Sequence, residues 1–217
     1  MRILAFTDIH SSYKRVFEII NSEKSDLVII GGDLTNVGTV QEVESVIRQL
    51  QTLTPNLLCV AGNMDLPQHD DLFCKLNVSI HGKGLIINEL GIFGVSGSPV
   101  SPLRTPYEID EEVIAEKIAE GYQDVLKAKI KILVSHAPPY GTKVDIVHSG
   151  FHAGSSAVRD FIENEKVDVV ICGHIHEARG QDVLGKTKII NCGQASRGYY
   201  GVIQISEKIE VTNSEYR

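Results

Sequence analysis

The sequence predicts an α/β protein, and two observations carry this prediction. Short runs of β-branched residues, typical of strands buried on both faces, alternate with segments whose apolar side chains recur at helical spacing. This alternation is the signature of parallel βαβ construction. In addition, most of the apolar runs stop at Asp, Asn or His. In parallel sheets the carboxyl ends of successive strands lie along one edge, where ligands bind.

The first part of the chain shows the alternation most clearly. Its predicted strands span residues 2–6, 27–30 and 57–60. Ser11 or Ser12 is a suitable N-cap for the first intervening helix, and Thr39 opens the second. The second helix ends at Pro55, which the third strand follows directly.

The middle of the chain changes character. Short apolar runs at 78–80, 84–87 and 92–95 are separated by Gly or Asn-Glu turns, which predicts an antiparallel meander. A loop with three prolines spans residues 97–106. A helix is expected from about Asp110, with an apolar stripe that comprises Val113, Ile114, Ile118 and Val125.

The remaining strands are predicted at residues 130–134, 167–171, 188–191, 199–205 and 209–212. Between the first two of them lie a long loop at 140–154 and a helix capped by Ser155 or Ser156. We find no linker, low-complexity segment or repeat, so residues 1–217 are predicted to form a single domain. The exposed edges of the last strands are compatible with a homodimer.

The composition is that of an ordinary globular protein. The chain has 217 residues, of which 42% are hydrophobic and 23% charged, enough for one domain with a substantial core. No apolar run approaches the roughly 20 residues that cross a bilayer, so no membrane partner is expected. The N-terminal run enters residues 7–10 without a cleavage pattern and is better explained as a first core strand than as a signal peptide.

The formal net charge of −7 argues against binding to extended nucleic acid, since no basic patch is visible. It does not exclude a phosphate substrate, because bound divalent cations would reverse the local sign. The four cysteines, Cys59, Cys74, Cys172 and Cys192, are scattered and form no C-x-x-C pair. We therefore expect a cytoplasmic protein without disulfides.

Side chains that bind divalent metals follow five of the apolar runs. They are Asp8, His10, Asp33, Asn63, His136, His174 and His176. Each alone has an ordinary explanation, since Asp and Asn form turns and His is often a satisfied polar residue. Five strands that all end in such residues at one sheet edge are hard to explain by chance and favour a metal site. Glycine stands at or just before the polar residue in three cases, Gly32, Gly62 and Gly173, where it allows close backbone approach.

Seven ligands exceed what one catalytic ion takes, since catalytic zinc uses about three protein ligands plus water. We therefore expect two divalent ions, roughly 3.5–4 Å apart, that share one carboxylate. Nitrogen and oxygen ligands without thiolates favour borderline ions over magnesium or calcium. Manganese is the expected metal, with iron, nickel or zinc as alternatives.

Five motifs between residues 8 and 176 resemble those of the calcineurin-like metallophosphoesterase superfamily. In order, they are Asp-x-His, Gly-Asp, Gly-Asn-x-Asp, a strand-terminal His and Gly-His-x-His. The segments His-Ala-Pro-Pro-Tyr-Gly-Thr and His-Ile-His-Glu-Ala-Arg-Gly are similar to those of small archaeal and bacterial members. The resemblance implies a four-layer α/β/β/α sandwich of two mixed β-sheets flanked by helices. It also implies which residues hold each ion: Asp8, His10 and His176 hold one metal, Asn63, His136 and His174 hold the other, and Asp33 bridges them.

The function implied by this resemblance is that of a metal-dependent phosphoesterase. We expect a phosphodiesterase that hydrolyses a small, nucleotide-like substrate by attack of a metal-bridging hydroxide on phosphorus, with Asp33 and Asn63 at the catalytic centre. The alternatives are a phosphomonoesterase or nucleotide pyrophosphatase, a nuclease, and a scaffold that keeps the fold without catalysis. The net acidity counts against the nuclease. The intact ligand set counts against the scaffold, because buried polar groups are costly without their ion.

One position departs from the family pattern. Many members carry Gly-Asn-His-Asp or -Glu in the third motif, with the histidine near the leaving group, whereas this chain has Met64. Methionine cannot donate a proton, so general-acid help, typically worth about 10²–10⁴-fold, is lost at this position. Either the substrate has a good leaving group, or another histidine supplies the proton. The candidates are His152, His148 and His69.

We favour His152, because it precedes a helix N-terminus that could itself bind phosphate; the alternative is an exposed loop histidine. Asp65 is expected to orient a metal ligand, with a turn role as the alternative. Arg104, Arg179 and His148 are candidate substrate contacts, with ordinary surface positions as the alternative.

Overall fold

The first of two large β-sheets contains the N-terminal βαβαβ unit. In spatial order its strands are β13 (Ile209–Glu215), β12 (Tyr199–Ile205), β1 (Arg2–Phe6), β2 (Leu27–Gly31) and β3 (Leu57–Val60). Strands β1, β2 and β3 are parallel, whereas β12 and β13 add to the sheet in antiparallel pairing. The helices that pack on this sheet are α1 (Tyr13–Ser22), α2 (Val40–Leu53) and α3 (Gln68–Lys75).

The second sheet is also mixed. Its strands, in spatial order, are β10 (Gly180–Leu184), β11 (Thr187–Asn191), β9 (Val169–Cys172), β8 (Ile130–Ser135), β5 (Leu90–Val95) and β4 (Gly84–Ile87). The inner pairs are parallel and the two outermost pairs antiparallel. The smaller elements and the helices of this half are β6 (Ser98–Pro99), β7 (Glu108–Ile109), α4 (Glu111–Asp124), α5 (Ser156–Asn164) and the 3₁₀ turns η1 (His176–Ala178) and η2 (Ala195–Arg197).

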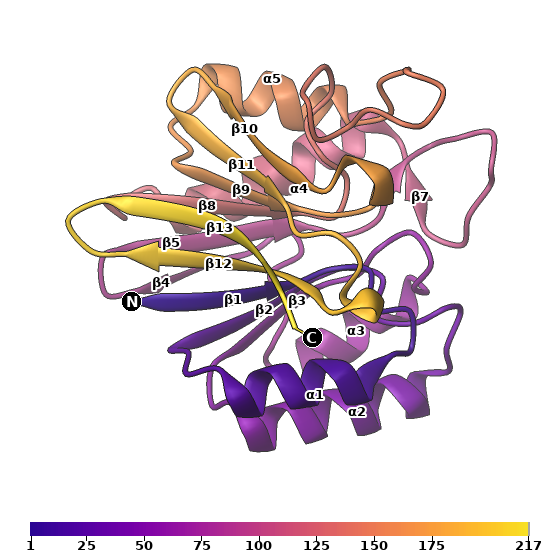
Figure 1. The fold of residues 1–217 in the computed structure, drawn as a ribbon. Coiled ribbons are helices and arrows are strands. Elements are labelled where there is room, and N and C mark those ends of the chain that lie inside the picture. The colour runs from indigo at the N-terminus through magenta and orange to yellow at the C-terminus, as the bar shows by residue number, and fades with distance from the viewer. Residues whose placement is uncertain (217) are drawn as a thin grey trace.

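The computed structural model describes residues 1–216. The two sheets pack face to face, and helices cover the outer face of each sheet (Figure 1). The buried side chains accordingly form three clusters, one between the sheets and one beneath each helical layer. The central cluster is rich in Ile and Val from both sheets, as expected for strands buried on both faces. The predicted four-layer sandwich is therefore confirmed.

Two of the predicted helix caps are formed. The Thr39 hydroxyl accepts the backbone N–H of Glu42 at 3.2 Å, and the Ser155 hydroxyl accepts that of Val158 at 3.1 Å. Ser12 occupies the N-cap position of α1, but its side chain makes no capping hydrogen bond. None of the helices within residues 1–216 combines the length and the hydropathy that a membrane-spanning segment needs. The four cysteines are all free thiols.

Several predicted elements differ from the structure. The meander is wrong: β4 and β5 pair antiparallel as expected, but β5 then pairs in parallel with β8. Residues 78–80 form only an isolated bridge, in which Ser79 pairs with Cys59 of β3. Val113, expected in the apolar stripe of α4, is 36% exposed, whereas Ile114, Ile118 and Val125 of the same predicted stripe are buried. Helix α3 and strand β10 were not predicted.

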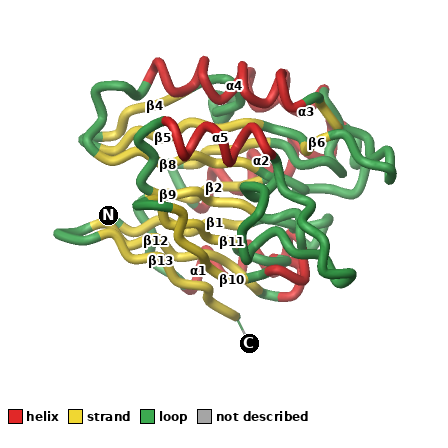
Figure 2. The backbone as a smooth tube through the Cα atoms, turned by 90° about the horizontal axis from the view of Figure 1, so that it is seen from above, coloured by secondary structure: helices red, strands yellow, loops and turns green. Residues whose placement is uncertain are grey.

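The carboxyl ends of the parallel strands of both sheets lie on the same side of the molecule. The long loops gather at this side, which is the right-hand side in both Figure 1 and Figure 2. The expected metal ligands follow β1, β2, β3, β8 and β9 directly, so the fold brings these five segments to one rim.

Candidate metal centre

Asp8, His10 and His176 form the first of two groups of potential ligands. One ligand atom from each of these residues lies within 4.8 Å of the others. The Nε2 atoms of His10 and His176 face each other at 3.3 Å, and His176 Nε2 lies 3.2 Å from Oδ1 of Asp8. His10 Nδ1 lies 2.8 Å from the side-chain oxygen of Asn36, which fixes the tautomer with the Nε2 lone pair free. A cation would satisfy both facing nitrogens at once.

Asn63, His136 and His174 form the second group. The Asn63 side-chain oxygen lies 2.8 Å from Nδ1 of His174 and 3.1 Å from Nε2 of His136. Nδ1 of His136 donates to the Gly31 carbonyl at 2.9 Å, so its Nε2 is again the atom free to bind a metal. This buried imidazole is therefore oriented by the last residue of β2.

Asp33 lies between the two groups. Its Oδ2 is 3.4 Å from Nε2 of His136 in the second group and 3.7 Å from Nε2 of His10 in the first. Its Oδ1 accepts the backbone N–H of Met64 at 2.7 Å, which holds the carboxylate in this orientation. Asp8 also approaches Asp33 and His136 within 4.8 Å, so the two groups are contiguous.

The backbone at the site is strained. Four of the expected ligands adopt positive φ angles, namely Asp8 (54°), His10 (46°), Asp33 (50°) and His174 (66°). Such conformations cost about 1–3 kcal/mol each for residues with a side chain and are characteristic of functional sites.

Glycine is required next to two of the ligands because a carboxylate lies directly against the backbone at these positions. A Cβ atom at Gly62 would overlap Oδ1 of Asp33, and one at Gly173 would overlap Oδ2 of Asp8. The carboxylates therefore occupy the space that side chains at these two positions would fill.

The electrostatics of the site favour a cation. Burial alone would raise the pKa of Asp8, but the hydrogen bond with His176 and the charge on His136 outweigh it, and the pKa is lowered. Burial opposes protonation of His136, yet the carboxylate of Asp33 raises the pKa of this imidazole to about 9. Burial and the neighbouring charge of His136 lower the pKa of His174 to about 4. The donor set of carboxylates, imidazoles and an amide oxygen is of the kind that binds borderline divalent ions.

Asp65 connects the turns that carry two ligands. Its buried carboxylate accepts backbone N–H groups from Gly62 at 2.9 Å, Leu34 at 3.1 Å and Thr35 at 2.9 Å. Burial raises the pKa of Asp65, but these backbone hydrogen bonds outweigh it and lower the pKa. The carboxylate thus clamps the residues that flank the two ligands, rather than touching their side chains.

A cavity of about 730 Å³ opens beside the second group of ligands. Asn63 and His174 form part of its wall, and so does His152. The rest comes mainly from the loops at 97–106 and 140–154, and from η1. The metal centre and this cavity therefore form one continuous site.

His152 is the predicted general acid, and a buried carboxylate orients it. Its Nδ1 lies 2.6 Å from Oδ1 of Asp145, which is fully buried. Asp145 also accepts the backbone N–H groups of Gly141, Thr142 and Gly154 at 2.9–3.1 Å, so its own position is fixed. The sequence alone did not identify Asp145, although it lies three residues beyond the quoted His-Ala-Pro-Pro-Tyr-Gly-Thr segment.

The phosphate site expected at the N-terminus of α5 is wrong. The Glu111 carboxylate accepts the backbone N–H groups of Ser156 at 2.8 Å and Ala157 at 3.1 Å. It also accepts the hydroxyl of Ser155 at 2.6 Å. An acidic side chain of the protein therefore occupies the position that phosphate would take.

The other candidate substrate contacts are not brought into the cavity wall. Arg179 lies over the ring of Tyr199, 4.1 Å from its centroid, and donates to the Ser214 carbonyl at 3.0 Å. Arg104 is exposed in its loop and does not line the cavity. His148 is also outside the wall, with 89% of its side chain exposed.

His69 is a satisfied core histidine. Its Nε2 donates to the Gly38 carbonyl at 3.0 Å, and its Nδ1 accepts the backbone N–H of Leu66 at 3.2 Å. Both ring nitrogens are thus engaged in the interior of the protein.

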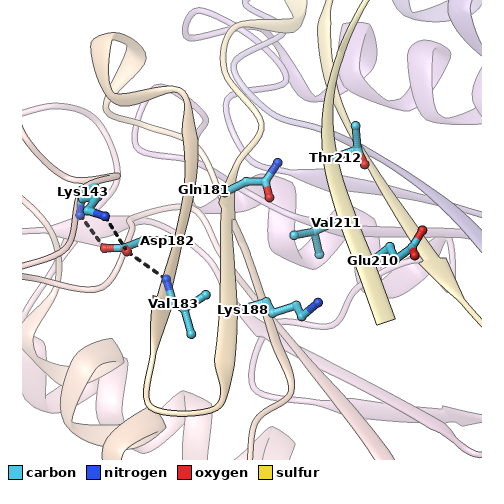
Figure 3. Close-up of a pocket in the computed structure, with 8 residues that line it drawn as sticks. All are labelled: Lys143, Gln181, Asp182, Val183, Lys188, Glu210, Val211 and Thr212. Carbon is cyan, nitrogen blue, oxygen red and sulfur yellow. Dashed lines mark hydrogen bonds and ion pairs between the residues drawn. The ribbon is translucent and has the colours of Figure 1, made fainter. Parts of the chain in front are cut away.

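A second cavity, of about 700 Å³, lies between the β10–β11 hairpin and β13 (Figure 3). Its charged residues include Lys143 and Asp182, and the Asp182 carboxylate accepts the backbone N–H of Lys143 at 2.8 Å. None of the expected metal ligands is among the eight residues drawn there. The catalytic chemistry is therefore expected in the cavity beside Asn63 and His174.

Comparison with known proteins agrees with this architecture. A family model for calcineurin-like phosphoesterases matches residues 1–178. An uncharacterized protein of Methanocaldococcus jannaschii is 34% identical over 195 residues, which cover 88% of this chain and 87% of its own.

Two solved structures share the fold. A dimetal phosphatase from Danio rerio superposes with a TM-score of 0.68 at 12% identity, over 100% of this chain and 99% of its own. An archaeal phosphodiesterase superposes with a TM-score of 0.55 at 18% identity, over 100% of both chains. At these identities the two structures show the fold alone. The family model, in contrast, spans most of the sequence and includes all seven expected ligands, so the chain belongs to the calcineurin-like phosphoesterase family.

Proposed function

We propose that this protein is a binuclear metal-dependent phosphodiesterase that acts on a small phosphorylated substrate. Membership of the family supports a hydrolase of phosphoester bonds. The single observation that carries the binuclear centre is the position of Asp33, whose Oδ2 lies 3.4 Å from Nε2 of His136 and 3.7 Å from that of His10. Asp33 is thus placed to bridge two ions, and the archaeal phosphodiesterase and the dimetal phosphatase share this fold.

The roles of the ligands follow from the two groups. Asp8, His10 and His176 would hold one ion, and Asn63, His136 and His174 the other, with manganese as the proposed metal. When bound, the two ions would supply an activated water as nucleophile and offset the negative charge of the phosphoryl oxygens. The strained turns and the Asp65 clamp hold the ligand side chains in place before any ion binds, which lowers the cost of assembling the centre.

His152 would protonate the leaving group in place of the family histidine that Met64 replaces. Its Nδ1 is engaged by Asp145, so Nε2 is the nitrogen that would carry the proton to the leaving oxygen. The location of His152 in the same cavity wall as Asn63 and His174 supports this role.

The charge of the cavity favours a diester over a monoester. Among the described residues that line it, none is Lys or Arg, whereas Glu111 and Glu177 are both present. A phosphate diester carries one negative charge, but a monoester at neutral pH carries nearly two. The additional charge would meet carboxylates rather than a guanidinium or ammonium group.

Hydrolysis of bis-p-nitrophenyl phosphate by the manganese-loaded protein tests this proposal. We expect activity on this diester with a higher kcat/KM than on p-nitrophenyl phosphate. Asp33→Asn is expected to lower kcat by about 10²-fold or more, and Asp160→Asn, an exposed aspartate of α5, to leave it unchanged. If the metal-loaded protein cleaves neither ester, the proposal is contradicted, and a scaffold role is favoured instead.

A further inference from the structure

Exposed hydrophobic side chains concentrate in the two loops around the cavity. Of the eleven large hydrophobic residues exposed within residues 1–216, five belong to these loops. They are Val100 (64% exposed), Leu103 (81%), Tyr140 (47%), Ile146 (37%) and Phe151 (73%). Clusters of this kind commonly mark a binding surface.

These loops supply much of the wall of the cavity to which the metal ligands Asn63 and His174 also belong. The apolar wall residues are Pro99, Val100, Pro102 and Leu103 from one loop and Tyr140 and Val147 from the other. The ring of Tyr140 packs edge-on against His152, with 5.6 Å between the ring centroids. The apolar part of the wall is therefore in direct contact with the proposed general acid.

The first loop is held firmly in place. The Glu108 carboxylate accepts the backbone N–H groups of Ser101 at 2.9 Å and Thr105 at 2.8 Å. It also accepts the hydroxyls of the same two residues, at 2.8 Å and 2.7 Å. Val100 and Leu103 are consequently presented on a pre-organised loop, which lowers the entropic cost of binding a ligand against them.

The carboxylates of the cavity already have partners within the protein. Glu111 caps the N-terminus of α5, and Glu177 accepts the backbone N–H of His148 at 2.8 Å. They add negative charge to a wall that has no Lys or Arg among its described residues. An anionic group beyond the reacting phosphate would be repelled there, whereas an uncharged apolar group would be accepted.

We infer that this wall is a subsite for an uncharged apolar or aromatic group esterified to the reacting phosphate. The substrate class is then a phosphodiester with one phosphate and one such arm, rather than a polyphosphate. This inference rests on the proposed phosphodiesterase activity and specifies which diesters that activity selects.

Three diesters with p-nitrophenol as a common leaving group test the inference. Their second arm is methyl, phenyl or 4-carboxyphenyl, so the released chromophore is the same while the arm changes. For the manganese-loaded wild type, we expect kcat/KM for the phenyl diester to exceed that for the methyl diester by about tenfold or more, the effect of filling an apolar pocket. The carboxylate of the 4-carboxyphenyl arm is expected to abolish this gain.

A double variant, Val100→Ser with Leu103→Ser, shows whether the wall is responsible. Both side chains are largely exposed, so their replacement is not expected to affect folding. The phenyl-to-methyl ratio of kcat/KM should fall about tenfold relative to wild type, a comparison in which the intrinsic reactivities of the esters cancel. Leu126→Ser, an exposed leucine outside the cavity, should keep the wild-type ratio.

The outcomes separate the two proposals. If wild type hydrolyses the diesters but the phenyl-to-methyl ratio is the same in the double variant, the subsite inference is overturned and the phosphodiesterase stands. The same conclusion follows if the 4-carboxyphenyl diester reacts as well as the phenyl diester. If wild type hydrolyses none of the three diesters, the phosphodiesterase proposal fails, and the inference that rests on it fails with it.

Discussion

Oδ1 of Asp145 lies 2.6 Å from Nδ1 of His152, and the carboxylate is fully buried while the imidazole side chain is 36% exposed. A buried carboxylate that also accepts three backbone N–H groups cannot reorient freely. It therefore fixes both the tautomer and the direction of the histidine, as expected for a group that positions a proton donor.

His152→Ala is expected to affect substrates according to their leaving group. A poor leaving group such as an alkoxide needs the proton, so kcat should fall by about 10²–10⁴-fold for alkyl diesters. p-Nitrophenolate leaves without protonation, so kcat for bis-p-nitrophenyl phosphate should change little. The measurement is the dependence of log kcat on leaving-group pKa, which should become steeper in the variant. An unchanged kcat on every diester tested would remove His152 from the mechanism.

Asp145→Asn should reproduce this pattern more weakly. The amide oxygen in place of Oδ2 can still accept the backbone N–H groups of Gly141 and Gly154. The amide NH₂ in place of Oδ1 cannot accept from His152 or provide the negative charge that stabilises a protonated His152. We expect kcat on alkyl diesters to fall about 10–100-fold, with KM nearly unchanged. Asp160→Asn is the matched control. Equal losses on alkyl and p-nitrophenyl diesters would indicate a structural role for Asp145 instead.

Asn36→Ala is expected to weaken metal binding. Its side-chain oxygen accepts Nδ1–H of His10 at 2.8 Å and so directs the Nε2 lone pair toward the metal position. Loss of such a partner typically lowers metal affinity about 10–100-fold. Calorimetric titration of metal-free protein with Mn²⁺ measures the change, and Asn164→Ala in α5 serves as the control. A dissociation constant equal to that of wild type would show that Asn36 does not orient His10.

The strand ends that carry the expected metal ligands were predictable from sequence because their signal is local. The runs before Asp33 and His174 are continuous and β-branched, and each stops at a polar residue. Parallel pairing aligns the strand ends within each sheet. The packing of the two sheets, which brings both sets of ends to one rim, has no such local signal.

The rest of the site depends on contacts between distant residues. Asn36 and His10, which form a hydrogen bond, are 26 residues apart in the sequence. Glu111 and Ser156, whose backbone N–H it accepts at the N-terminus of α5, are 45 residues apart. Such pairs have no local pattern, so the N-terminus of α5 appeared open from sequence although Glu111 fills it. Helix α3 was missed for a related reason. It is short and buries His69 and Asp70, which interrupts the apolar periodicity on which helix prediction relies.

Asp65→Ala is expected to destabilise the metal-free protein by about 3 kcal/mol or more. The substitution leaves the buried N–H groups of Gly62, Leu34 and Thr35 without their acceptor, and each such loss costs about 1–3 kcal/mol. Because the pKa of Asp65 is lowered in the folded state, its contribution is present above the unfolded value of about 3.9 and is lost as pH falls through the folded value. Urea unfolding in the presence of a chelator measures both effects. A loss below about 1 kcal/mol would contradict the clamp role.

Asp70 should have the opposite pH dependence. Burial raises the pKa of this carboxyl, although hydrogen bonds from Tyr107 at 2.6 Å and Ser96 at 2.7 Å partly offset it. The folded state therefore holds the proton more tightly than the unfolded state, and stability is lost as pH rises from about 3.9 through the raised value. Asp70→Asn removes this loss, so the free energy of unfolding of the variant relative to wild type should increase between pH 4 and pH 7. A relative value that is constant or decreases over this range would be inconsistent with the raised pKa.

Anomalous diffraction from crystals grown with Mn²⁺ tests the central claim most directly. We predict two manganese peaks roughly 3.5–4 Å apart on either side of the Asp33 carboxylate. One should lie beside Asp8, His10 and His176, and the other beside Asn63, His136 and His174. A single peak, or none, in a manganese-replete crystal would contradict the binuclear centre and the hydrolytic mechanism built on it.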